Sequence, residues 1–238
     1  MKTVLLLLLL QATVLAPDEP VSTVATPALA VGWPLDDATR VLGGALQDSL
    51  LEPAPPGDVP DKPAHVYRYS EAVSVSVRNE IAYQFTRNSL LDPTAKVQVQ
   101  QNFENTDLVS KLQPVFADMG YPVHSVATAL SAWLLVNYGI IHDTPTTDVQ
   151  NAAVYRQIST LLARLPMMTE MEDAEKQRIA EGLYWIATLQ QYAYEQAQAG
   201  IPGYSLSVIA SDARHTLHNF GLDADALHLD DTGFSLQK

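Results

Sequence analysis

The sequence contains no cysteine. This absence excludes disulfide bonds, thiol catalysis, thiolate metal sites and a lipidated N-terminal cysteine. A chain of 238 residues is nevertheless long enough to bury a hydrophobic core without covalent or metal support. Fold stability must therefore come from packing and hydrogen bonding.

Basic residues are scarce, at 14 lysines and arginines against 27 aspartates and glutamates. The formal net charge is −13 at pH 7, and the sequence pI is about 4.7. A surface of this sign repels polyanions. We therefore expect no nucleic-acid partner.

Charge is missing altogether from residues 123–141, VHSVATALSAWLLVNYGII. A helix over 123–139 has apolar residues on nearly every side, so it predicts a central helix enclosed by others. A transmembrane span is the competing interpretation. Acidic flanks at Asp118 and Asp143, rather than basic anchors, favour enclosure within the protein, and so do five polar residues in the stretch: His124, Ser125, Thr128, Ser131 and Asn137.

The N-terminus has the pattern of a secretory signal peptide over residues 1–16. Lys2 supplies the positive charge, residues 4–10 are apolar, and residues of small or intermediate size at 14–16 precede a possible cleavage site. The apolar part is too short for a bilayer of roughly 30 Å. We predict export to the periplasm or the extracellular space, with no stable membrane span after cleavage. Because Pro17 is a poor residue after a cut, retention as an anchor is the alternative.

Prolines are concentrated early in the chain, with nine of the fifteen before residue 64. Proline removes a backbone donor and disfavours helix at the preceding residue, so residues 17–64 are predicted to form a disordered, proline-rich linker. A short helix over 36–51 is possible within it, weakened by Gly43 and Gly44. The folded domain is expected over 65–238.

Helical periodicity dominates that domain. Helices are predicted at 74–87, 108–120, 123–139, 147–165, 171–199 and 205–220, followed by a turn and an extended tail that packs back. Pro114 implies a kink or a break, and Thr169 to Glu172 has capping-box spacing before the longest helix. The predicted fold is all-α, an orthogonal or bundle-like domain of five or six helices around 123–139 and 171–199.

Four segments carry a resemblance to a known family. They are Gly120-Tyr121-Pro122 leading into SVATALSAWLLVNYG, then VYRQI, DAEKQRIAEGLYWIATL and ARHTLHNFGLDADALHLDDTGF. Over residues 65–234 the chain resembles a family of bacterial exported proteins classed as a domain of unknown function. The resemblance implies a helical exported domain and brings no catalytic residues.

A metal site has one set of candidates, Asp212, His215 and His218, spaced by one helical turn. His215 is expected to point away from the apolar face of its helix, where a metal would lack a shaped, shielded cavity. Surface histidines are therefore the favoured interpretation, and neither a metal nor a cofactor is predicted. His142 beside Asp143 is a weaker hydrolytic candidate, because adjacent side chains generally point apart.

Three functions follow from these patterns. The leading hypothesis is a non-catalytic exported domain that acts through contacts with an unidentified protein partner, with no oligomeric state specified. The second is a metal-dependent or hydrolytic enzyme that uses His142 or Asp212, His215 and His218. The third is a carrier of a small apolar ligand between the two aromatic-rich central helices.

Overall fold

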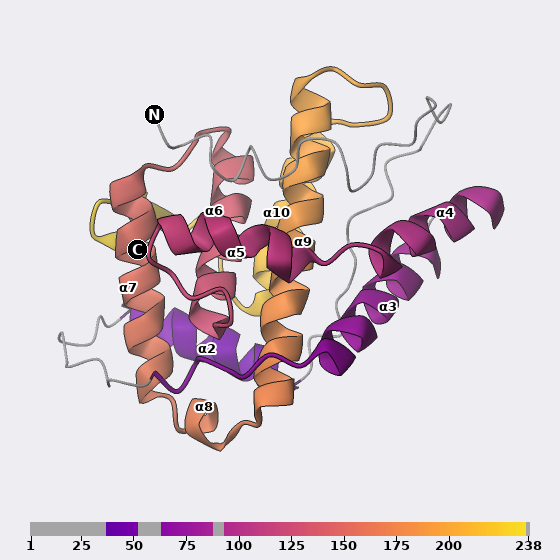
Figure 1. The fold of residues 1–238 in the computed structure, drawn as a ribbon. Helices are drawn as coiled ribbons and strands as arrows, with labels where there is room; N and C mark the ends of the chain where they lie inside the picture. The colour runs from indigo at the N-terminus through magenta and orange to yellow at the C-terminus, as the bar shows by residue number, and fades with distance from the viewer. Residues whose placement is uncertain (1–36, 52–62, 88–92, 237–238) are drawn as a thin grey trace.

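The computed structural model describes residues 37–51, 63–87 and 93–236 (Figure 1). The described parts are mostly helical, as predicted, and end in one short β-hairpin. Their elements are α2 (Asp37–Leu51), α3 (Glu71–Arg87), α4 (Pro93–Glu104), α5 (Leu108–Asp118), α6 (Val126–His142), α7 (Asp148–Arg164), α8 (Pro166–Glu170), α9 (Asp173–Gln198), α10 (Leu206–Phe220), β1 (Leu227–Asp230) and β2 (Gly233–Leu236). The predicted signal peptide and most of the predicted linker lie outside the described residues.

The prediction of five or six helices is wrong, because the described residues alone form nine. One of the additional helices, α4, covers a stretch rich in glutamine and valine in which no periodicity was identified. Phe103 is its buried residue, and its ring lies 4.9 Å from the ring of Trp185 on α9. Tertiary packing around that aromatic contact stabilises a helix whose own sequence signal is weak.

The central helix α6 is enclosed as predicted, but it begins at Val126 rather than at residue 123. The residues before it are extended because they pair with the chain at Val66: the Tyr67 amide donates to the His124 carbonyl at 3.1 Å, and the Val126 amide donates to the His65 carbonyl at 3.0 Å. Ser125 is the N-cap and accepts a hydrogen bond from the Thr128 amide.

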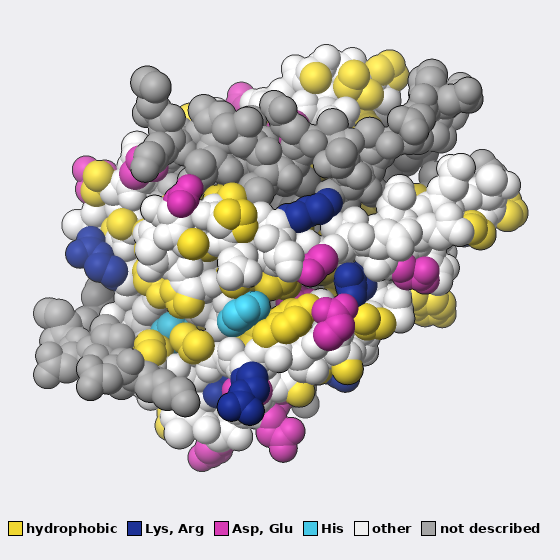
Figure 2. Space-filling model, in the orientation of Figure 1, with side chains coloured by type: hydrophobic (Ala, Val, Ile, Leu, Met, Phe, Trp, Pro, Cys, Tyr) yellow, Lys and Arg dark blue, Asp and Glu magenta, His cyan; other side chains and the backbone are white. Residues whose placement is uncertain are grey.

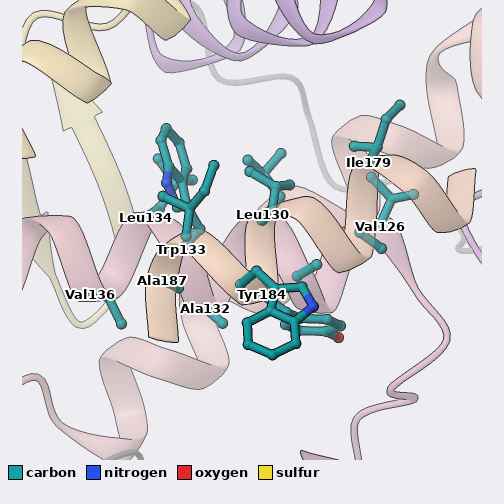
Figure 3. Packing of buried hydrophobic residues seen from close by; sticks show 14 of the residues in the cluster. Val126, Leu130, Ala132, Trp133, Leu134, Val136, Ile179, Tyr184 and Ala187 are labelled. Carbon is teal, nitrogen blue, oxygen red and sulfur yellow. The ribbon is translucent and has the colours of Figure 1, made fainter. Parts of the chain in front are cut away.

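Helices α6 and α9 run side by side in the same direction and share the most extensive helix contact in the described chain (Figure 1). Near the start of α6 the Tyr184 hydroxyl donates to the Val123 carbonyl at 2.9 Å. Further along, the buried amides of Asn137 and Gln190 pair through two hydrogen bonds of 3.1 and 3.0 Å. Figure 3 shows buried hydrophobic side chains of both helices, among them Val126 and Leu130 of α6 and Ile179 of α9.

The start of the longest helix differs from the capping-box prediction. Thr169 lies within α8, and α9 begins after Glu172 without a side-chain cap. A complete capping box occurs instead at the start of α7, where Thr147 and Gln150 exchange hydrogen bonds. Of the kink or break predicted at Pro114, the break is absent, since α5 continues through that residue.

The C-terminal segment forms a β-hairpin in which Leu227 pairs with Leu236 and Leu229 with Phe234. The predicted inward packing of Leu227, Leu229 and Phe234 is confirmed, since each is at most 5% exposed. A glutamine on α7 holds the hairpin: the Gln157 side chain donates to the Phe234 carbonyl at 2.8 Å and accepts from the Phe234 amide at 2.9 Å.

Helix α2 docks on the domain through three buried leucines, Leu42, Leu46 and Leu50. Gly43 permits the close approach, because a Cβ placed there would lie 1.6 Å from the carbonyl oxygen of Phe220 at the end of α10. Gly44 has open space around it. Of the two glycines that weaken this helix, Gly43 is therefore required by packing.

In the part of the chain that the structure covers, none of the helices combines the length and apolarity needed to span a bilayer.

Candidate functional site

A pocket of about 300 Å³ lies where four helices approach one another. It is bordered by the end of α5, one side of α6, the start of α7 and the last turns of α9. In Figure 1 the ends of α6 and α9 and the start of α7 lie at the same side of the molecule. The lining residues are Phe116, Met119, Tyr121, Thr128, Ser131, Ala132, Leu135, Val136, Gly139, Asp143, Thr144, Pro145, Thr146, Asp148, Asn151, Tyr155, Gln191, Tyr194 and Gln198.

The pocket wall on α6 follows from helical spacing. Residues three and four apart share a helix face, so Thr128, Ala132, Leu135 and Gly139 all lie toward the pocket. Figure 3 shows Ala132 and Val136 on the opposite side of α6 from Leu130 and Leu134. One face of the helix therefore packs in the core, and another borders open space.

Three tyrosines from different elements line the pocket. The rings of Tyr121 and Tyr155 stack, with centroids 4.2 Å apart and planes 29° apart. Tyr194 lies on α9. All three are half-buried, and in the stacked pair each ring covers one face of the other. Half-buried aromatic rings at a pocket suit a planar or apolar ligand.

The rim of the pocket contains a hydrogen-bonded group formed by Asp143, Tyr194 and Gln198. The Tyr194 hydroxyl donates to the Asp143 carboxylate, and the Gln198 side chain donates to the Tyr194 hydroxyl at 2.8 Å. Burial, followed by the hydrogen bond to Asp143, raises the pKa of Tyr194 to about 12. This group connects the loop after α6 to the end of α9.

Asp143 adopts a left-handed backbone conformation, with φ of 49°, as the C-cap of α6. Among the described residues it is the only one other than glycine with positive φ. Aspartate tolerates this conformation better than most residues. The chain turns sharply at Asp143, and the turn brings its carboxylate to the rim of the pocket.

Ser131 supplies a polar group within the largely apolar wall. Its side chain is 4% exposed, and its hydroxyl has no hydrogen-bond partner among the described residues. A buried hydroxyl left without a partner costs free energy, about 1–3 kcal/mol. A ligand polar atom or a water molecule in the pocket would remove that cost.

The three predicted metal candidates all lie on α10, away from the pocket. His215 and His218 are exposed, as expected from the helix periodicity, and Asp212 is half-buried. Within the ranges described, no cluster of three or more histidine, aspartate or glutamate side chains could hold a metal ion.

The hydrolytic candidates His142 and Asp143 are not brought together. The His142 ring packs on Tyr138, with ring centroids 4.2 Å apart, whereas the Asp143 carboxylate bonds to Tyr194. Burial is the main cause that lowers the pKa of His142, and the nearby Arg214 adds to it.

The aromatic residues Trp133, Trp185 and Tyr184 of the two central helices lie in the core. The sequence did not single out the pocket tyrosines. One available signal was the spacing of Tyr194 and Gln198, one turn apart on α9 near its end. No pattern in the sequence indicated that α6 would leave one face uncovered.

Comparison with known proteins gives one match. A family model described as a family of unknown function (DUF6683) matches residues 53–237. The match begins before residue 65, where the resemblance was expected to start. No curated protein and no solved structure matches the chain.

Proposed function

Because the chain belongs to the DUF6683 family, whose function is unknown, we propose a function from the geometry of the chain itself: the domain binds a small, largely apolar molecule in the pocket between α6, α7 and α9. This is the third of the functions that the sequence suggested. It now stands ahead of the other two because a specific cavity supports it.

The observation that carries the proposal is a pocket of about 300 Å³ with a mostly apolar and aromatic wall and an unpartnered buried hydroxyl at Ser131. Small-molecule sites typically have this composition and a volume of at least roughly 300 Å³. Open space beside a central helix is otherwise unfavourable, because its walls lose packing contacts. A bound molecule would restore those contacts.

The test uses N-phenyl-1-naphthylamine, a neutral dye whose fluorescence rises in apolar surroundings. We expect saturable binding of one dye per chain, with a Kd on the order of 1–100 µM for a ligand of this size. Leu135→Trp places a large ring at the pocket wall and should abolish binding. Ile141→Trp is the matched control, because Ile141 is also half-buried on α6 but does not line the pocket.

Two results would contradict the proposal. One is the absence of saturable binding by a folded protein. The other is equal loss of binding in Leu135→Trp and Ile141→Trp, which would trace the signal to a general loosening of the fold.

Contact with a protein partner is the second candidate function. Its support is the hairpin of α3 and α4, where three large apolar side chains are exposed: Val75 by 40%, Tyr83 by 57% and Val97 by 54%. Hydrophobic side chains reach the surface at the outer part of this hairpin in Figure 2. A photo-crosslinking residue at Tyr83 should capture a protein that the same residue at the exposed Glu175 does not.

We further propose that the domain acts outside the cytoplasm, in the periplasm or the extracellular space. The N-terminal pattern of Lys2 followed by an apolar run supports this location. Cell fractionation together with mass determination of the N-terminus tests it. An intact N-terminus in the cytoplasmic fraction would overturn the proposal.

A further inference from the structure

The charge around the pocket has one sign. Of its lining residues, Asp143 and Asp148 are the two that carry a formal charge at neutral pH, and no lysine, arginine or histidine lines it within the described residues. Burial is the main cause that raises the pKa of the Tyr121 phenol in the pocket, Asp148 adds to the rise, and the exposed Arg156 on α7 opposes it. The charged side chains that line the pocket itself are both carboxylates.

The helix ends around the pocket reinforce this negative potential. Helices α5, α6 and α9 all end at it, with Met119, Asp143 and Gln198 among the lining residues. The C-terminus of a helix carries a partial negative charge from its unpaired carbonyl groups. Three such ends therefore border the pocket.

One helix end at the pocket, the N-terminus of α7, has the opposite partial charge, and this charge is partly neutralised. Helix α7 begins at the pocket, and its N-terminus carries a partial positive charge. However, Thr147 accepts a hydrogen bond from the Gln150 amide there, and Asp148 places a full negative charge in the first turn. The balance of helix ends and side chains favours a cation.

The tyrosine rings add a second source of cation affinity. The faces of aromatic rings carry negative electrostatic potential and attract ammonium groups within about 6 Å. Tyr121, Tyr155 and Tyr194 line the same pocket as the two carboxylates. Aromatic faces beside carboxylates, with apolar residues behind them, match an amphipathic organic cation.

We infer that the preferred ligand is an organic cation with an aromatic or other apolar body, whose ammonium or related group lies at the rim formed by Asp143, Asp148 and Tyr194. The inference depends on the proposed pocket function. The apolar body occupies the space beside Ala132, Leu135 and Val136, and the Ser131 hydroxyl accepts or donates a hydrogen bond inside. Anions of the same shape are disfavoured.

The test compares three molecules that share a naphthalene body and differ in charge: 2-(1-naphthyl)ethylamine, 2-(1-naphthyl)ethanol and 1-naphthaleneacetate. Each displaces N-phenyl-1-naphthylamine from the full chain near neutral pH and at low salt. The amine should bind about fivefold to tenfold more tightly than the alcohol, and the acetate more weakly than either. Rising ionic strength should reduce the preference for the amine, because both carboxylates are exposed.

Substitution of Asp143 and Asp148 tests whether their carboxylates cause the preference for the amine. The double variant Asp143→Asn and Asp148→Asn should remove most of the preference for the amine over the alcohol, while an asparagine oxygen at residue 143 can still accept from Tyr194. Glu175→Gln is the control, since it removes one carboxylate charge in the first turn of α9, whereas the pocket lies at the last turns of that helix. This control should change neither the affinity for the amine nor the affinity for the alcohol.

The outcomes separate the two proposals. Equal binding of amine and alcohol, or tighter binding of the acetate, overturns the cation inference and leaves the pocket function standing. An amine preference that survives in the double variant also overturns it. Binding of none of the three molecules, together with no dye binding, overturns the pocket function itself.

Discussion

The two ends of α6 show how one uncharged helix can be closed at its start and open at its finish. At the N-terminal end, Ser125 is fully buried and bonds to His65 through a 3.0 Å contact between Oγ and Nδ1. At the C-terminal end, Asp143 is exposed and forms the rim of a pocket. An apolar sequence alone does not distinguish these two environments. The neighbouring elements create the difference, because they bury the N-terminal end of α6 and leave a pocket beside its C-terminal end.

The largest expected contrast compares two leucines on this helix. Leu130 is 0% exposed in the solid core, so Leu130→Ala should lower the free energy of unfolding by about 3 kcal/mol through lost burial and a residual cavity. Leu135 borders the pocket and is half-buried, so Leu135→Ala should cost about 1 kcal/mol. Chemical denaturation measures both. Equal losses of unfolding free energy in the two variants would show that both faces of α6 are packed alike.

Acid should destabilise the closed end. Burial, assisted by Lys176, lowers the pKa of His65 from 6.5 to about 4. The unfolded chain therefore binds the proton more readily, so the stability contributed by neutral His65 is present above pH 6.5 and is lost as the pH falls toward 4. The loss should reach about 2–3 kcal/mol.

Comparison of the wild type with His65→Gln isolates this contribution. The variant should be less stable near neutral pH, but its unfolding free energy should fall less steeply between pH 6.5 and 4. If the free energies of unfolding of the two proteins fall in parallel between pH 6.5 and 4, His65 is not the source of the acid sensitivity.

Asn137 on α6 and Gln190 on α9 are both buried, so each side-chain amide should depend on the other for its hydrogen bonds. Asn137→Leu leaves the buried Gln190 amide without Asn137, at a cost of about 2 kcal/mol. Replacing both residues by leucine should recover much of that loss, because no buried polar group is then left unpaired. A double-mutant cycle by denaturation measures the coupling, and additive losses would argue against the pairing.

The smallest effect is expected at the open end. Tyr194→Phe removes the hydroxyl that donates to Asp143, but this hydrogen bond is exposed to solvent. The free energy of unfolding should change by less than about 1 kcal/mol. Thermal unfolding is the readout, and a loss comparable to that of Leu130→Ala would mean that the rim is part of the structural core.

Much of the fold was predictable because helices with strong periodicity and clear ends have local causes. Helix α6 was located from its uncharged apolar stretch and α10 from its periodicity and the terminating Gly221, so both helices were placed within a few residues. Helix α4 was missed because Phe103 gains its stability from Trp185, a residue distant in sequence. The β-hairpin was expected only as an extended tail because its anchor, Gln157, is also distant.

The candidate site was predictable only in outline. An apolar-ligand site between the central helices was one of three hypotheses, and both α6 and α9 do line the pocket. The particular residues were not identified, because Tyr121, Tyr155 and Tyr194 come from three separate elements. The histidines that drew attention by spacing, His215 and His218, lie exposed on α10.

The sequence by itself determined the helical class, the burial of most of α6 and the absence of cysteine chemistry, since each follows from composition or from local periodicity. Only the tertiary structure decided which side of α6 would be filled and which would border a pocket. The reason is geometric: helices α5, α7 and α9 meet α6 at positions set by contacts such as Asn137–Gln190, and the space they leave depends on their combined placement.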